Sequence, residues 1–174
     1  GQVSLSVALA SALCAAVIGT PIGLAAGYLG GWLDAQLMRL VDSVIALPLL
    51  PLLIVMAAID PAKLGLEETA DASTFGLIRI IVIVSLVGWT TPARLVRGAT
   101  LAARAQGYVQ AARALGVPPL AIALRHILPN ISGPLIVATT LAMGQVILFE
   151  SALSFLGLGI QPPTASWGNM LTGA

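Results

Sequence analysis

The sequence has 174 residues, of which 58% are hydrophobic and 9% are charged, and its formal net charge is +1. An ordinary soluble domain carries about 25% charged residues, so the composition excludes that class and indicates a membrane protein. The single cysteine, Cys14, lies in an apolar run, which excludes a disulfide framework. The chain starts at Gly1 without Met or a basic leader, and we expect it to be a fragment of a longer protein, lacking the first span and most of the last.

Four apolar segments are long enough to predict membrane-spanning helices, since about 20 helical residues cross the bilayer core. They are too long and too weakly alternating for barrel strands, and backbone groups in lipid must find their partners within the segment. The sequence therefore predicts an all-α fold, a polytopic transmembrane helical bundle that forms a single transmembrane domain. The predicted spans cover about residues 3–29, 37–59, 77–95 and 131–156.

Small residues recur at helical spacing in the first span, where Gly19, Gly23 and Gly27 stand four residues apart. Such a stripe lets another helix approach closely, either within this chain or in a partner subunit. Near the start of the second span, Arg39 and Asp42 stand three residues apart and are predicted to pair on one helix face. Bends are expected at five prolines, because each interrupts helical hydrogen bonding: Pro21, Pro48, Pro51, Pro92 and Pro134.

The distribution of basic residues predicts the orientation. Five of the eight Lys and Arg residues lie around and after the end of the third span with no acidic residue among them: Arg94, Arg97, Arg104, Arg113 and Arg125. The loop after the second span, residues 60–73, is acidic instead. Lys and Arg near span ends mark the cytoplasmic side, so residues 104–130 are predicted to be cytoplasmic and residues 60–73 external. By alternation, the turn at Gly30–Gly31 is then cytoplasmic.

The predicted cytoplasmic segment has the pattern of two short helices joined by a glycine turn. Residues 110–115 are mostly strong helix formers, and Gly116 suits the left-handed position that follows a helix. Prolines are tolerated in a first helical turn, so a second helix is predicted to begin at residues 118–119. We expect this helix to end at Leu128, because the pair Pro129–Asn130 follows.

This segment resembles a loop of one transport family. The pattern Gln110-Ala111-Ala112, three residues, Gly116, nine residues, then His126-x-Leu128-Pro129 resembles the EAA loop of inner-membrane permeases of binding-protein-dependent ABC importers. Gln110 stands where the family has glutamate, so it keeps hydrogen bonding but loses the charge, and His126 replaces an apolar residue. The stretches GYLGGWLDAQLMRLVD (27–42) and LSFLGLGIQPPTASWGNML (153–171) resemble the subgroup that imports dipeptides, oligopeptides or nickel.

The resemblance implies a permease subunit that couples ATP hydrolysis by partner subunits to uptake, with no catalytic residue, metal or cofactor of its own. In the family the EAA loop is a coupling helix that sits in a cleft of a cytoplasmic ATPase, and ATP is bound by that partner. The implied assembly has two ATPase subunits, a second permease subunit that is a relative of this one, and an extracytoplasmic substrate-binding protein. It lies in the inner membrane of a bacterium or archaeon.

The resemblance also assigns residues within the loop at about 104–130. The implied ATPase-coupling residues are Gln110, Ala111, Ala112, Arg113, Ala114, Leu115 and Gly116. The implied supporting residues are Pro118, Arg125, His126, Leu128 and Pro129.

Two other classes of function stay open. A membrane-anchored helix-turn-helix regulator would bind DNA with the same two helices, but Arg125 and His126 are the only basic groups on the second, a poor footprint for phosphate. A channel or secondary transporter would need ionisable groups at depth, and Glu150 in the fourth span is the candidate. For Glu150 we expect a structural role near the outer surface, within reach of water. A lone histidine such as His126 makes no metal site.

Residues 157–170, between the fourth span and the end of the chain, are predicted to be external. Pro162, Pro163 and Gly168 predict a shaped loop, and Trp167 suits a membrane interface. The loop either meets a substrate-binding protein or lines the entrance, or it is a simple connecting hairpin.

Overall fold

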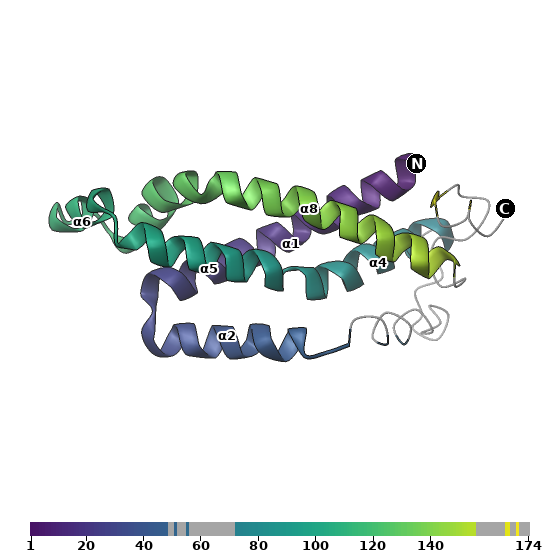
Figure 1. The fold of residues 1–174 in the computed structure, drawn as a ribbon, viewed down its shortest axis with the longest axis horizontal. Helices are drawn as coiled ribbons and strands as arrows, with labels where there is room; N and C mark the ends of the chain where they lie inside the picture. The colour runs from purple at the N-terminus through teal and green to yellow at the C-terminus, as the bar shows by residue number, and fades with distance from the viewer. Residues whose placement is uncertain (49–50, 52–54, 56–71, 156–165, 168–169, 171–174) are drawn as a thin grey trace. The chain divides into compact units, whose positions relative to one another are not determined.

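A computed structural model describes residues 1–48, 51, 55, 72–155, 166–167 and 170 (Figure 1). Regular structure within these residues is helical throughout, in agreement with the predicted all-α class. In chain order the helices are α1 (Gln2–Leu29), α2 (Gly31–Ile45), α4 (Ala72–Gly88), α5 (Thr90–Arg104), α6 (Gly107–Ala114), α7 (Pro119–Ala121), η2 (Ile122–Ile127) and α8 (Leu128–Phe155).

Three helical stretches are long and apolar enough to cross a membrane: Gln2–Leu29, Ile80–Arg104 and Pro119–Ser154. They overlap the first, third and fourth predicted spans. The second predicted span lies partly outside the described residues. Residues 37–45 of it belong to α2, which begins at Gly31, before the predicted start, and ends at Ile45. Residues 60–71 of the acidic loop and most of the 157–170 loop also lie outside the described residues.

The predicted end of the second short helix at Leu128 is wrong, because the chain stays helical from α7 into α8. One π-helical turn, η2, directly precedes α8. A proline has no N–H to donate, and its ring crowds the carbonyl four residues earlier, so a regular α-helix would break at Pro129. In a π-helical turn the backbone hydrogen bonds span five residues and not four, which changes the carbonyls that need a donor. In addition, Nδ2 of Asn130 donates to the His126 carbonyl at 2.9 Å, so helical structure passes through the pair expected to stop it.

The chain forms two compact units, and the first contains the described parts of residues 1–13, 47–88 and 141–174. Its apolar core joins three helices that the sequence places far apart. From α1 come Val7 and Ala8, from α4 Ile80, Ile83 and Val84, and from α8 Val146 and Leu153.

Glu150 of α8 is fully buried in this first unit, so the expectation that it reaches water is wrong. Ser154 lies one helical turn further on, and its Oγ donates to Oε1 of Glu150 at 2.8 Å. A second buried serine, Ser85 of α4, donates to the Ser11 carbonyl of α1 at 3.4 Å. A polar group taken out of water needs such partners; Ser154 supplies one to Oε1 of Glu150, while Oε2 is buried without a hydrogen-bond partner among the described residues.

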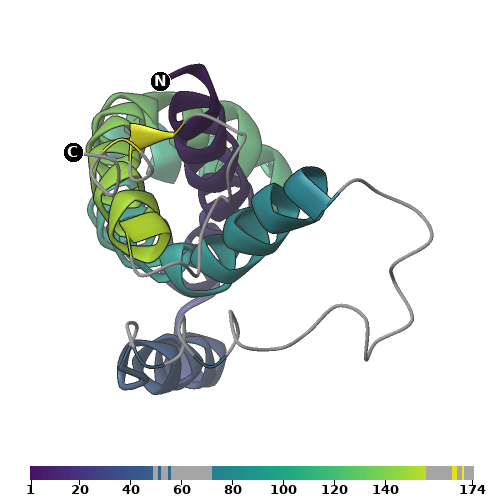
Figure 2. The same ribbon diagram turned by 90° about the vertical axis from the view of Figure 1, so that its right-hand side faces the viewer.

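The second unit contains residues 14–46 and 89–140. After α1 ends, Gly30 and Gly31 have φ of 67° and 60°, a region that glycine enters without strain. The chain there reverses its direction into α2 (Figures 1 and 2). One apolar cluster of this unit contains Leu24, Val96, Ala103, Val109, Ala112, Ile122, Ile127 and Ile131, and a second contains Ala15, Val41, Trp89 and Ala93.

The glycine stripe of α1 packs against α5 of the same chain. A Cβ atom added to Gly19 would lie 2.4 Å from the Trp89 carbonyl oxygen, and one on Gly23 would lie 2.5 Å from the Ala93 carbonyl oxygen. A Cβ on Gly27 would lie 2.7 Å from Cβ of Thr100. These distances are too short for any side chain, so the stripe brings two backbones together within this chain, the first of the two interpretations that the sequence left open.

We predict that Gly23→Ala destabilises the protein, because the new methyl group meets the α5 backbone, which cannot turn aside. Overpacking of this kind lowers the free energy of unfolding by about 1–3 kcal/mol. Gly98→Ala is the matched control: its Cβ meets no described atom within 4 Å, and alanine favours a helix over glycine by about 1 kcal/mol. Thermal unfolding of both variants in detergent measures the difference. Equal midpoints would contradict the contact.

Candidate functional site

Two ion pairs join α2 to α5. Nε and Nη2 of Arg97 donate to Oδ1 and Oδ2 of Asp34 at 2.5 and 2.7 Å, a bidentate pair whose side chains are 33% and 16% exposed. These hydrogen bonds, with the charge of Arg97, hold the pKa of Asp34 below its ordinary value. Arg94 pairs with Asp42 in a more exposed setting, where both side chains are more than half exposed.

The predicted pair between Arg39 and Asp42 is therefore wrong. Val41 is buried in α2 within the cluster that contains Trp89 and Ala93, and this packing of α2 against α5 brings Arg94 within reach of Asp42. The spacing of three residues along one helix permits a pair but adds little, about 0.2–0.5 kcal/mol, so a partner on a neighbouring helix can replace it.

Arg104 closes the end of α1. Its Nη1 donates to the carbonyls of Gly27 and Tyr28 at 3.2 and 3.3 Å. The last carbonyls of a helix have no partner within that helix, and a cation is favourable beside them. With Arg113, which donates to the Tyr28 hydroxyl of α1, four of the five arginines that predicted the orientation have partners on α1 or α2.

α6 carries the predicted coupling motif and ends as the sequence predicts. Gly116 has φ of 76°, the left-handed conformation of a glycine after a helix. Its N–H donates to the Arg113 carbonyl at 3.0 Å, and the N–H of Val117 donates to the Ala112 carbonyl at 3.1 Å. This pair of bonds is the Schellman motif, which satisfies the final carbonyls and turns the chain sharply. The next helix begins at Pro119, after Pro118 in extended conformation.

The two faces of α6 differ. Val109 and Ala112 are buried in the apolar cluster that contains Leu24 of α1, so Ala112 faces the interior of the unit. Gln110, although exposed, donates from Nε2 to the Ala105 carbonyl at 3.2 Å, which caps the end of α5. The remaining predicted coupling positions, Ala111, Arg113, Ala114, Leu115 and Gly116, are also exposed.

Leu115 is the most exposed large hydrophobic residue of the described chain, with 83% of its surface exposed. Its position at the end of α6, directly before the Schellman turn, lifts it away from the cluster beneath the helix. An isolated exposed leucine is ordinary on a protein surface. One at the tip of a short helix, beside two exposed alanines, makes a small apolar surface with no bulky neighbour on α6.

The five predicted supporting residues are not equivalent. Pro118 and Pro129 are both exposed: Pro118 directly precedes α7 in extended conformation, and Pro129 follows η2 inside the continuous helical stretch. Leu128 packs against the apolar cluster, and His126 is half-buried, with its carbonyl bonded to Asn130. Arg125 is exposed. Within the described residues no three His, Cys, Asp or Glu side chains come together as metal ligands would.

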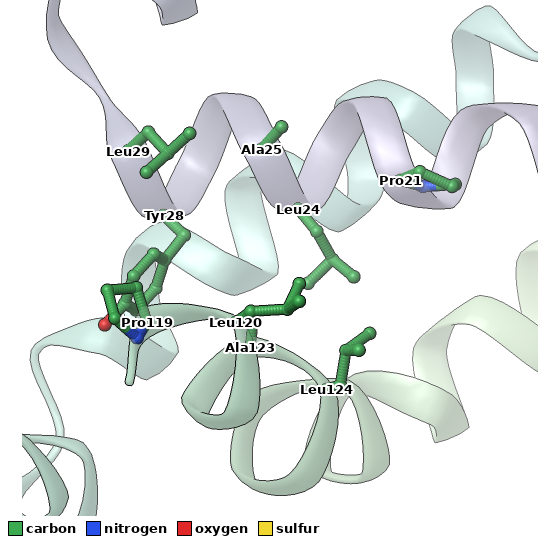
Figure 3. Close-up of a pocket in the computed structure, with 9 residues that line it drawn as sticks. All are labelled: Pro21, Leu24, Ala25, Tyr28, Leu29, Pro119, Leu120, Ala123 and Leu124. Carbon is green, nitrogen blue, oxygen red and sulfur yellow. The ribbon is translucent and has the colours of Figure 1, made fainter. Parts of the chain in front are cut away.

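A pocket of about 340 Å³ lies between the end of α1 and the α7–η2 segment (Figure 3). Its walls are almost entirely apolar. The lining residues are Pro21, Leu24, Ala25, Tyr28, Leu29, Pro119, Leu120, Ala123 and Leu124. No local sequence pattern predicts the pocket, and the available signal for Tyr28 is a tyrosine at the end of an apolar run.

Comparison with known proteins decides between the classes of function. Residues 19–174 match the family described as binding-protein-dependent transport system inner membrane component. The chain belongs to this family. With its three long apolar helices, it is a multi-pass protein of the inner membrane.

Curated relatives of this chain include permeases named for oligopeptide and glutathione transport. The oligopeptide transport system permease protein OppC of Salmonella typhimurium strain LT2 is 44% identical over 96 residues, or 55% of this chain and 32% of that protein. OppC of Bacillus subtilis strain 168 is 36% identical over 137 residues, or 79% and 41%. The glutathione transport system permease protein GsiD of Shigella flexneri serotype 5b is 38% identical over 141 residues, or 81% and 42%. The chain spans less than half the length of each of these relatives.

We predict that the Asp34–Arg97 pair contributes to the stability of the permease more than the exposed Asp42–Arg94 pair. Asp34→Asn should lower the free energy of unfolding by about 1 kcal/mol at neutral pH, and the matched change Asp42→Asn by less than about 0.5 kcal/mol. Because folding lowers the pKa of Asp34, its contribution is complete above the ordinary value of 3.8 and is lost as the pH falls through the lowered value.

Denaturant or thermal unfolding in detergent at pH 7 and at about pH 3 measures both effects. The gap between the parent and Asp34→Asn should narrow on acidification. A gap that widens at low pH, or equal effects of the two variants at pH 7, would contradict the assignment.

Proposed function

We propose that the full-length protein is the membrane-spanning permease of an ABC importer and that α6 is its coupling helix. The observation that carries this proposal is the position of α6. One face is packed into the second unit, the other is exposed, and a sharp turn ends the helix at Gly116. Such a helix can enter a cleft of a partner while its base stays fixed to the permease.

The proposed partners are two cytoplasmic ATPase subunits, a second permease subunit related to this one, and an extracytoplasmic substrate-binding protein. ATP is bound by the ATPase subunits. Closure of the ATPases around ATP displaces the coupling helices, and ATP biases the assembly between two states through contacts that differ in each. The permease itself is non-catalytic in this proposal, as the relatives are transport permease subunits.

Peptides are the proposed cargo. The relatives described above are named for oligopeptide and glutathione transport, and glutathione is a small peptide. Nickel, which the sequence resemblance also allowed, has no support from these relatives or from the described side chains.

The exposure of individual α6 residues supports a smaller proposed docking surface than the whole motif. Ala112 is buried and Gln110 is bonded to the end of α5, so the docking surface consists of Ala111, Ala114 and Leu115. Small residues allow a cleft wall to approach the helix backbone. Full burial of a leucine side chain contributes about 1.5–3 kcal/mol, which makes Leu115 the main apolar anchor.

The DNA-binding alternative requires a recognition helix that is free to enter a DNA groove, and the proposed segment does not fit that requirement. The segment that would enter a DNA groove, α7 with η2, continues directly into α8 as one helical stretch that is long and apolar enough to cross a membrane. A recognition helix must lie along the groove with its polar face on the bases, and this one is held by an apolar helix at its end.

The first test is purification of the full-length protein from its native membrane in mild detergent, with every co-purifying chain identified. An ATPase, a second permease and a binding protein are the expected companions. A cysteine introduced at the exposed position Ala111 should cross-link to the ATPase. A purified complex without an ATPase, even after cross-linking, would refute the proposal.

We predict that Leu115→Ala weakens association with that ATPase by about tenfold, because it removes most of the buried apolar surface at the tip. Leu120→Ala is the matched control, since Leu120 is 71% exposed but belongs to α7. Titration of the purified ATPase against the permease in nanodiscs measures both. Equal losses would show that the tip of α6 is not the anchor.

We also predict that Gly116→Val abolishes docking while leaving the protein folded. A β-branched residue at positive φ is strained by about 1–3 kcal/mol, and the turn that presents Leu115 would relax. Gly107→Val is the control: a Cβ at either glycine meets no described atom within 4 Å, but only Gly116 has positive φ. Unchanged uptake and ATPase binding in Gly116→Val would contradict the role of the turn.

A further inference from the structure

Tyr28, in the last turn of α1, is the residue at which α6 contacts α1 through polar and aromatic groups. The guanidinium carbon of Arg113 lies 4.9 Å from the centre of the Tyr28 ring, and Nε of the same arginine donates to the Tyr28 hydroxyl at 3.2 Å. Tyr28 also packs against the apolar cluster that contains Val109 and Ala112 of α6. The Tyr28 side chain therefore contacts both the buried face of α6 and the last turn of that helix.

These contacts give Arg113 a different task from the one that the family resemblance assigns. A guanidinium over an aromatic face gains about 0.5–1 kcal/mol at an exposed site, and the hydrogen bond to the hydroxyl fixes its orientation. The positive group that projects from the last turn of α6 thus bonds to α1 of its own chain.

The end of α1 that carries Tyr28 is held on its other side by α5. Arg104 donates to the Tyr28 carbonyl at 3.3 Å, and a Cβ on Gly27 would lie 2.8 Å from the Arg97 carbonyl oxygen and 2.7 Å from Cβ of Thr100. A backbone oxygen and a Cβ atom are fixed to α5 and cannot turn aside to absorb a displacement. A push on Tyr28 is therefore passed to α1 and α5 as a pair.

We propose that Tyr28 and Arg113 form the link through which a displacement of α6 reaches α1. This inference rests on the proposed function of α6 as the coupling helix. Tyr28 is in this view a positioning residue: it contacts neither cargo nor ATPase, and its removal separates ATP hydrolysis from movement of the spans. Coupling travels through packed contacts that have two arrangements, and this junction is the direct contact between the docked helix and the first described span.

The experiment uses the full-length permease with its ATPases in nanodiscs. Cys14 lies on α1, is exposed, and is the single cysteine of the 174 residues, so a thiol-reactive fluorophore can report on α1 once cysteines elsewhere in the complex are replaced. The readouts are ATPase binding, the rate of ATP hydrolysis, and the ATP-dependent change in the fluorescence of the probe attached to Cys14.

The variants distinguish the specific contact between Tyr28 and Arg113 from simple packing of an apolar side chain at position 28. Tyr28→Leu keeps apolar volume but removes the ring and the hydroxyl, Tyr28→Phe keeps the ring, and Arg113→Lys keeps the charge without the planar group. Tyr108→Leu is the matched control, because Tyr108 lies on α6 and is 40% exposed. We expect Tyr28→Leu to reduce the ATP-dependent change at Cys14 about fivefold while ATPase binding stays within about twofold of the parent.

Tyr28→Phe should give an intermediate reduction of the response at Cys14. Tyr28→Leu combined with Arg113→Lys should reduce this response no more than Tyr28→Leu alone, because both substitutions remove the same contact between Tyr28 and Arg113.

A full response at Cys14 in Tyr28→Leu with the ATPase bound would overturn the link and leave the proposed function intact. Equal losses in Tyr108→Leu would also overturn it. If the parent binds no ATPase, the proposed function fails and the link with it. The conservative pair Tyr28→Phe and Arg113→Lys keeps the test decisive if Tyr28→Leu does not fold.

Discussion

Where Gly19, Gly23 and Gly27 face α5, two helices meet backbone to backbone, and the other contacts of the second unit depend on this approach. In lipid there is no hydrophobic force to hold helices together, so association relies on close packing and on hydrogen bonds. The close approach brings the end of α5 beside the end of α1, where Arg104 can reach the Gly27 and Tyr28 carbonyls. One glycine stripe thereby sets both the spacing of two spans and the capping of one of them.

The same junction explains how a short helix can serve as a docking element. α6 has eight residues, and a helix of that length is marginal by itself in water. Here its buried face, its terminal turn and the Tyr28 ring hold it, so its exposed side can be small and nearly featureless. A partner that binds Ala111, Ala114 and Leu115 would then act on a helix already fixed to α1.

Sequence reasoning reached the fold class, the helix of the first span, the Gly116 turn and the family, because each depends on local signals or on a motif. It failed where a partner from elsewhere in the chain decides the outcome. The spacing of Arg39 and Asp42 could not reveal that Arg94 of α5 lies nearer, and the Pro129–Asn130 pair could not reveal the π turn that accommodates it. The contact of Arg113 with Tyr28 joins residues 85 positions apart, so no local pattern could reveal it.

The ion pairs show, independently of the count of basic residues, which segments share one side of the membrane. Asp34 and Arg97 can pair only if the turn after α1 and the second half of α5 lie on the same side of the membrane. Charges are costly at the centre of a bilayer, so Arg97, Arg104 and their partners mark an end of α1 and α5 that lies near or beyond the hydrocarbon boundary. The alternation of predicted spans puts the Gly30–Gly31 turn and residues 104–130 on one side as well. A contact between side chains and a rule about loop charges thus require the same topology, and α6 lies at the end of the molecule where both place the basic residues.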